Sequence, residues 1–198
     1  MNEYQECKTD GSTIERLPDG GLRLSIPAGP AGSYRVAQID DYSGLPRGRF
    51  AWQAPFRLAL SARAAAAQLP GTWGMGLWND PFSMGRLSGG QLRLPALPNA
   101  AWFFFASPEN HLAIDDRLPG SGALAGVFRS PPWPAAWVLA GAPALPLLLW
   151  PPAARLLRRL ARPFVRQQAA ALPVDPSEWH EYSLVCDGRQ TRFAVDGA

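Results

Sequence analysis

The chain has 198 residues, 47% of them hydrophobic and 11% aromatic, a composition that excludes an intrinsically disordered protein and allows one sizeable core. Its 21 prolines and 19 glycines divide it into short segments, which favours strands and turns over long helices. Eighteen arginines and one lysine against 16 acidic residues give a net charge of +3, but most arginines lie singly along the chain, so we expect no nucleic-acid partner.

The two cysteines, Cys7 and Cys186, stand apart, without a CxxC partner or a histidine cluster. This pattern predicts neither a disulfide-stapled scaffold nor a zinc site, and we expect no metal and no cofactor. Residues 1–21 are polar and contain no apolar signal region. We therefore expect a cytoplasmic protein or one that lies peripherally on a membrane.

Alternation of apolar and polar residues marks the first part of the chain. It occurs over residues 21–26 and 34–42 and in the two runs around Pro55. This period predicts half-buried strands. Two later runs, "GTWGMGLWNDPF" at 71–82 and "AAWFFFAS" at 100–107, are apolar on both faces, as is typical of strands near the middle of a two-layer sandwich.

The last segment, "EYSLVCDGRQTRFAVDG" at 181–197, consists of two alternating runs joined across Asp187-Gly188. An Asp-Gly pair between such runs is a strong signal for a β-hairpin. Together these segments predict an all-β protein with a single β-sandwich domain over residues 1–198.

Residues 131–173 break the alternation. No charged residue occurs from Pro131 to Pro152, and the residues that follow predict a helix from about Pro152 to Ala171, outside the strand order. Pro163 is expected to kink this helix or to start a second one. One face of the helix carries Arg155, Arg158, Arg159, Arg162 and Arg166, and the opposite face carries Leu156, Leu157, Leu160 and Phe164.

This amphipathic insertion leaves three alternatives. A membrane-spanning helix needs about 20 apolar residues, and the stretch between Trp133 and Trp150 is shorter and contains three prolines, so we do not favour a crossing. An interfacial anchor on anionic lipid fits Trp133, Trp137 and Trp150 together with the arginine face. The third alternative is a cover that packs on the sandwich or on a second copy of the chain.

Three motifs, in this order, resemble glycoside hydrolase family 16, which contains laminarinases and lichenases. Residues 48–80, "GRFAWQAPFRLALSARAAAAQLPGTWGMGLWND", are similar to the family's strand of alternating Ala and Arg that leads through Pro-Gly-Thr-Trp into a tryptophan-bearing strand. "AAWFFFASPEN" at 100–110 occupies the place of the family's catalytic strand, and "EWHEYSLVCDGRQTRFAVDG" at 178–197 resembles its late hairpin. The resemblance covers residues 34–197 outside the insertion. It implies a concanavalin A-like jelly roll whose concave sheet binds sugar.

The chain departs from the family at the catalytic strand. The family carries Glu, Asp and Glu on one face of this strand, whereas residues 101–106 contain no carboxylate. A retaining glycosidase needs two carboxyl groups about 5–5.5 Å apart, so we predict a non-catalytic relative. Cys186 stands where the family usually has tryptophan, and the family's final strand would follow Ala198. The resemblance thus implies either a chain that lacks this strand or an unpaired sheet edge.

Other acidic groups offer no evident replacement. The pairs Asp40–Asp41 and Asp115–Asp116 consist of adjacent residues, which point to opposite faces of a strand, so we expect turns or caps there. Asp80 precedes a proline and also predicts a turn. His111 and His180 are isolated, and we expect His180 to be a hydrogen-bonded strand residue rather than a metal ligand.

Aromatic residues are better functional candidates, although aromatic side chains in a sandwich also fill the core. A saccharide packs its C–H face on an aromatic ring and needs hydrogen bonds for its hydroxyls at the rim. The carbohydrate-binding candidates are Trp73, Trp78, Asn79, Trp102, Glu109 and Asn110. We therefore expect a non-catalytic carbohydrate-recognition or scaffolding module, which associates through residues 131–173 either with an anionic membrane surface or with a second copy of the chain. The alternatives are a β-glucan hydrolase with a relocated acid–base pair and a membrane-anchored structural protein without a sugar ligand.

Overall fold

The computed structural model describes residues 4–30, 33–81, 93–110, 112–133, 156, 159–160 and 162–198. Eleven β-strands and one short 3-10 helix lie in these ranges. The chain divides into two compact units, one made of residues 1–51 and 80–95 and the other of residues 52–79 and 96–198. Each unit has its own sheets.

The first unit contains two small antiparallel sheets of two strands each. β1 pairs with β4, and β2 pairs with β3. The chain turns between β2 and β3 at Gly20, whose φ of +84° is a conformation that glycine adopts without strain. The elements are β1 Gln5–Lys8, β2 Thr13–Arg16, β3 Leu22–Ser25, β4 Ala37–Asp40 and the 3-10 helix η1 Arg47–Arg49.

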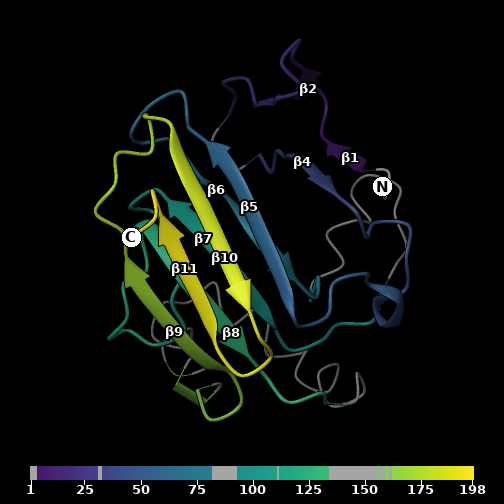
Figure 1. The fold of residues 1–198 in the computed structure, drawn as a ribbon, viewed down its shortest axis with the longest axis vertical. Helices are drawn as coiled ribbons and strands as arrows, with labels where there is room; N and C mark the ends of the chain where they lie inside the picture. The colour runs from purple at the N-terminus through teal and green to yellow at the C-terminus, as the bar shows by residue number, and fades with distance from the viewer. Residues whose placement is uncertain are drawn as a thin grey trace. The chain divides into compact units, whose positions relative to one another are not determined.

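The second unit contains two larger sheets, in which all neighbouring strands are antiparallel. One sheet has the order β11-β10-β5 and the other has the order β6-β7-β8-β9. In Figure 1 the strands β5, β10 and β11 lie in front of β6, β7 and β8. The strands are β5 Phe56–Ala62, β6 Thr72–Trp78, β7 Ala100–Ala106, β8 Gly122–Arg129, β9 Arg166–Ala171, β10 His180–Cys186 and β11 Thr191–Val195.

Apolar side chains from both sheets of the second unit form one core between them. Phe103 on β7 is only 1% exposed, and its ring centroid lies 5.0 Å from that of Tyr182 on β10. The same phenyl ring meets Phe193 on β11 edge to face at 5.1 Å. The two sheets therefore pack face to face, and each contributes every second residue of its strands to the core.

The prediction of an all-β chain with antiparallel sheets is confirmed. The alternating runs at 21–26 and 34–42 contain β3 and β4, and the two runs that are apolar on both faces contain β6 and β7. The predicted final hairpin is present as β10 and β11, with Gly188 in its turn at a φ of +91°.

The predicted helix over Pro152–Ala171 is wrong in its last part. Arg166–Ala171 forms β9, which pairs with β8, and residues 162–165 form a turn. Part of the predicted insertion thus belongs to the strand order, and Arg166 does not lie on a helical face. The sequence "RQQAAA" has good intrinsic helix formers, but pairing with the backbone of β8 outweighs that preference.

Other parts of the insertion are described only in places. The elements of the described residues include no α-helix, so the predicted amphipathic helix has no support there. Leu156, Arg159 and Leu160 have helical backbone, and all three are exposed. The residues that lie outside the described part of the chain include Trp137, Trp150, Arg155, Leu157 and Arg158.

Tyr182 carries the one polar atom in the centre of the core cluster. Its hydroxyl is buried and has no hydrogen-bond partner among the described residues. Burial is the main cause that raises the pKa of this phenol, with a smaller contribution from the negative charge of Asp196. The hydroxyl therefore adds a desolvation cost to the core and no hydrogen bond in return.

We expect Tyr182→Phe to leave the free energy of unfolding unchanged or to raise it by about 1 kcal/mol, because the unpaired hydroxyl is removed while the ring contacts stay. Phe103→Ala should instead lower it by about 3–5 kcal/mol, through lost apolar burial and a cavity between the sheets. Urea unfolding of both variants measures the two effects. A loss of several kcal/mol in Tyr182→Phe would show that the hydroxyl has a partner.

Candidate functional site

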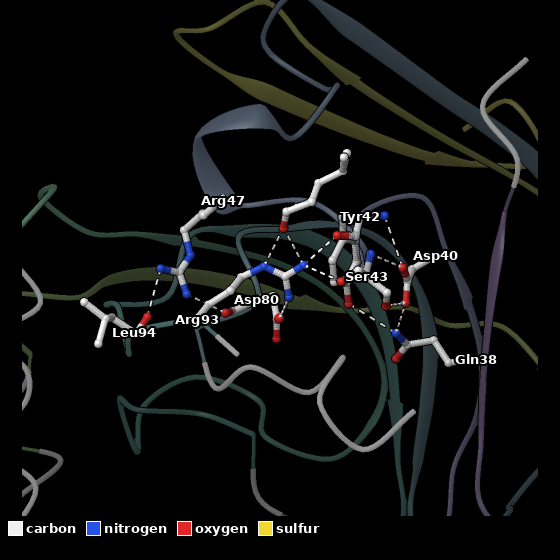
Figure 2. Close-up of polar contacts among 9 residues, drawn as sticks. Gln38, Asp40, Tyr42, Ser43, Arg47, Asp80, Arg93 and Leu94 are labelled. Carbon is white, nitrogen blue, oxygen red and sulfur yellow. Dashed lines mark hydrogen bonds and ion pairs between the residues drawn. The ribbon is translucent and has the colours of Figure 1, made fainter. Parts of the chain in front are cut away.

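The most extensive polar cluster lies in the first unit, around the guanidinium of Arg93 (Figure 2). Arg93 Nη1 donates to Asp80 Oδ2 at 2.5 Å, and both side chains are almost completely buried. Nε donates to the carbonyl of Leu45 at 3.0 Å, and Nη2 donates to the carbonyls of Tyr42, Ser43 and Leu45 at 2.5, 3.1 and 2.7 Å. Two nitrogens of this arginine, Nε and Nη2, therefore hold the backbone of residues 42–45, and the third, Nη1, pairs with Asp80.

The neighbours of Arg93 complete this cluster. The guanidinium carbon lies 5.4 Å from the ring centroid of Tyr42 and 5.1 Å from that of Phe50. Asp40 accepts hydrogen bonds from the amides of Tyr42 and Ser43 at 3.1 and 2.7 Å. Arg47 donates to the carbonyl of Asp80 at 2.8 Å. Because these polar groups satisfy one another, the cluster acts as an internal brace of the first unit and leaves no group poised for a substrate.

Asp80→Asn should lower the free energy of unfolding of the first unit by about 3–5 kcal/mol, because it leaves the buried Arg93 charge without its counter-ion. Asparagine keeps the volume and tolerates the positive φ of 44° at this position, so the backbone should not contribute. Urea unfolding and amide hydrogen exchange at Tyr42 and Ser43 measure the effect.

Glu15→Gln is the matched control, since Glu15 forms an exposed pair with Arg23 at 3.6 Å in the same unit and should cost less than about 1 kcal/mol. If Asp80→Asn proved as harmless as this control, the brace would contribute little to stability.

His180 in the second unit is held at both ring nitrogens. Nδ1 lies 2.7 Å from Asp196 Oδ2, and Nε2 lies 2.9 Å from the carbonyl oxygen of Asp175. The hydrogen bond with Asp196 is the first cause that raises the pKa of His180, and the Asp175 carbonyl adds to it. Asp196 in turn accepts a bond from the amide of Glu181 at 2.9 Å, and His180 is the main cause that lowers the pKa of Asp196.

Both partners of His180 are acceptors, so the protonated imidazole satisfies the site by donating from both nitrogens. A histidine with no free ring nitrogen cannot serve as a general base. The expectation that His180 is a hydrogen-bonded strand residue agrees with this geometry.

His180 should titrate above its ordinary pKa of about 6.5. Its protonated form stabilises the fold, so this contribution is fully present below about pH 6.5 and is lost as the pH rises through the higher folded pKa. In His180→Gln the midpoint of thermal unfolding should therefore change less across pH 6–8 than in the wild type. A proton NMR titration gives the pKa directly, and a value below 6.5 would contradict the assignment.

Aromatic side chains gather on the side of the four-stranded sheet that faces away from the core. Ala101, Phe103 and Phe105 of β7 point into the core, so the alternate residues Trp102 and Phe104 point to the opposite side. The register places Trp78 of β6 and Phe128 of β8 on that same side. We call Trp78, Trp102, Phe104 and Phe128 the aromatic face.

The four rings of the aromatic face are half-buried and form a continuous chain of contacts. The ring centroids of Trp78 and Trp102 lie 5.9 Å apart, and those of Trp102 and Phe104 are also 5.9 Å apart. Phe104 and Phe128 meet edge to face at 6.1 Å. The chain of rings crosses β6, β7 and β8.

Glycines make room for these rings. A Cβ atom at Gly74 would lie 2.5 Å from Trp102 Nε1, and one at Gly76 would lie 3.0 Å from Trp102 Cδ2. On the other side, a Cβ atom at Gly126 would lie 3.6 Å from the ring of Phe104. The indole of Trp102 thus rests on bare backbone, which weakens the strand but allows the close approach of a ring.

An amide side chain borders the aromatic face. Gln167 on β9 lies directly opposite Phe128, and its Oε1 accepts a hydrogen bond from the amide of Ile114 at 2.7 Å. Within the described ranges, the side-chain nitrogen of Gln167 makes no hydrogen bond. One amide donor is therefore available at the rim.

The structure separates the predicted sugar-binding residues into four groups. Trp78 and Trp102 lie together on the aromatic face. Trp73 lies on the core side, where it stacks on Phe105 with ring centroids 3.8 Å apart. Asn79 is used internally, since it donates to the carbonyl of Leu97 at 2.9 Å and accepts from the amide of Asn99 at 2.9 Å.

Glu109 and Asn110 lie beyond the opposite end of β7 from Trp78. Asn110 donates to Ser107 Oγ at 2.9 Å. The hydrogen bond from its own amide, followed by one from Ser107, lowers the pKa of the exposed Glu109 carboxyl. The length of β7, roughly 20 Å, separates this loop from the ring of Trp78.

The adjacent carboxylates Asp115 and Asp116 have a structural partner. Arg162 pairs with Asp115 at 2.8 Å and with Asp116 at 3.4 Å, which ties both carboxylates to a cation. His111 lies outside the described residues. Cys7 and Cys186 are both free thiols.

In the described part of the chain, no three His, Cys, Asp or Glu side chains lie close enough together to hold a metal ion. No helix of the described ranges is long and apolar enough to cross a membrane.

Comparison of the chain with protein-family models, curated proteins and solved structures finds no match. The sequence patterns did not identify Phe104, Phe128 and Gln167, because their place on the aromatic face follows from the strand register. A period-2 reading of "AAWFFFA" combined with the neighbouring glycines is the signal that could have found Phe104.

Proposed function

We propose that the protein is a non-catalytic carbohydrate-recognition module that binds a glycan on the aromatic face. The observation that carries the proposal is the chain of four half-buried rings on the side of the sheet opposite the core. Packing stability alone requires apolar residues only on the core side of a sheet. Rings on both sides favour a binding role for the second side.

The chemistry of the face favours a neutral sugar. The residues that share it by register are alanine, glycine, leucine, threonine and glutamine in addition to the four aromatic residues, so the face carries no charge. A pyranose packs its C–H face on such rings, and its hydroxyls accept hydrogen bonds from amide donors at the rim. The side-chain nitrogen of Gln167 would supply such a donor.

The same strands argue against glycoside hydrolysis. β6, β7, β8 and β9 contain no aspartate or glutamate, so the sheet offers neither a nucleophile nor a general acid. The finer fold that the resemblance to glycoside hydrolase family 16 implies, a concanavalin A-like jelly roll, is part of this proposal. Face-to-face packing of two antiparallel sheets supports it.

The test is binding of soluble β-glucan oligosaccharides by isothermal titration calorimetry. Trp78→Ala and Phe128→Ala should each weaken binding about tenfold, which corresponds to about 1.4 kcal/mol and to one lost ring contact. Their thermal unfolding midpoints should show that the fold is kept. A reducing-end assay should detect no turnover.

Trp179→Ala is the matched control, because Trp179 is 64% exposed and its ring lies 5.3 Å from the guanidinium of Arg63 rather than on the aromatic face. It should bind glycan as the wild type does. If no glycan of the panel binds, or if all three variants bind equally, the carbohydrate proposal fails.

A further inference from the structure

A second surface lies where β8 and β9 end. The last pair of their antiparallel ladder is Arg129 with Arg166, so the chain leaves the sheet after Arg129 and returns at Arg166 beside it. Just beyond this pair, the rings of Trp133 and Phe164 meet with centroids 4.6 Å apart. We call Arg129, Trp133, Phe164 and Arg166 the ladder end.

The ladder end has an uncompensated positive charge. Arg129 and Arg166 are exposed and directly opposite each other, a like-charged pair that destabilises an antiparallel ladder. No carboxylate of the described residues forms an ion pair with either of them. The nearby Arg162 differs, since Asp115 and Asp116 neutralise it. An external anion would therefore relieve the repulsion between Arg129 and Arg166.

The ladder end is also apolar and open to solvent. Trp133 is 41% exposed and Phe164 is 42% exposed, although the two rings touch. Leu156 and Leu160, four residues apart in helical backbone close to Phe164 in sequence, are 57% and 59% exposed. Arg159 lies between these two leucines and is exposed as well.

This combination fits one kind of partner. Arginine binds phosphate with two parallel hydrogen bonds, and a paired tryptophan and phenylalanine suit the boundary between headgroups and acyl chains. Exposed leucines beside arginines add apolar insertion to the charge attraction. A soluble anion would use the arginines and leave the rings and leucines in water.

We propose that the ladder end docks on a membrane surface that contains anionic phospholipid. Arg129 and Arg166 bind the lipid phosphates, and Trp133 and Phe164 enter the interface. The docking is independent of the aromatic face, because the two surfaces share no residue.

Vesicle co-sedimentation of the full chain tests the proposal, with phosphatidylcholine vesicles compared with phosphatidylcholine–phosphatidylserine vesicles. The wild type should bind the anionic vesicles, and less so in high salt. Arg129→Gln with Arg166→Gln should weaken binding about 25-fold, the product of about fivefold for each lost charge near the surface. Trp133→Ala should weaken binding while the dependence on phosphatidylserine remains.

The matched control is Arg57→Gln with Arg192→Gln, which removes two exposed arginines from the three-stranded sheet of the same unit. This variant and Trp78→Ala should both bind anionic vesicles as the wild type does. The second result also separates membrane docking from glycan binding.

Three outcomes would overturn the proposal. Equal binding to neutral and anionic vesicles would remove the role of charge, and equal loss in both double variants would show a dependence on net charge alone. Absence of vesicle binding would also refute it, whether the chain then dimerises through Trp133 and Phe164 or binds inositol hexakisphosphate in solution through the two arginines.

Discussion

The alternation of side chains along β7 is the constraint on which the second unit depends. Successive residues of a strand point to opposite sides, so Phe103 and Phe105 enter the core while Trp102 and Phe104 point away from it. A shift of register by one residue would exchange the two sets. Because the strand is apolar at every position, the same run of residues builds the core and an apolar surface behind the sheet. The core and the proposed recognition surface thus both depend on one strand.

The ionisable groups of the described residues serve mainly to hold the backbone. Arg93 joins Asp80 and the carbonyls of residues 42–45, and His180 joins Asp196 and the carbonyl of Asp175. In both places a charged group meets its partners inside the chain, which limits the protonation chemistry that it could perform on a ligand. The surfaces whose side chains could contact a ligand are the neutral aromatic face and the basic ladder end. These are the two surfaces on which the proposed glycan binding and the proposed membrane docking depend.

Local patterns predicted what depends on local physics. The alternating run after Pro55, the doubly apolar runs and the Asp187-Gly188 turn led to β5, β6, β7 and the final hairpin. The run before Pro55, residues 49–53, was also predicted to be a strand, and that prediction is wrong. The ion pair between Asp80 and Arg93 could not be predicted, because no local sequence pattern indicates which arginine pairs with which carboxylate. β9 was missed for a related reason: alanine, glutamine and arginine favour a helix locally, and only the backbone of β8 makes the strand preferable. Trp73 and Trp78 lie five residues apart on β6. Because this separation is odd, their side chains point to opposite sides of the sheet.

The contact between the indole of Trp102 and the glycine backbone beneath it links residues 74, 76 and 102 in the evolution of the chain. Any side chain at Gly74 or Gly76 would collide with the indole and also with the carbonyl oxygens of Phe103 and Ala101 on the neighbouring strand. A smaller residue at position 102 would in turn leave two glycines exposed in mid-strand, with their entropic cost and no ring to cover them. Single substitutions are therefore unfavourable in either direction. The three residues are expected to persist together or to be replaced together as lineages of this chain diverge.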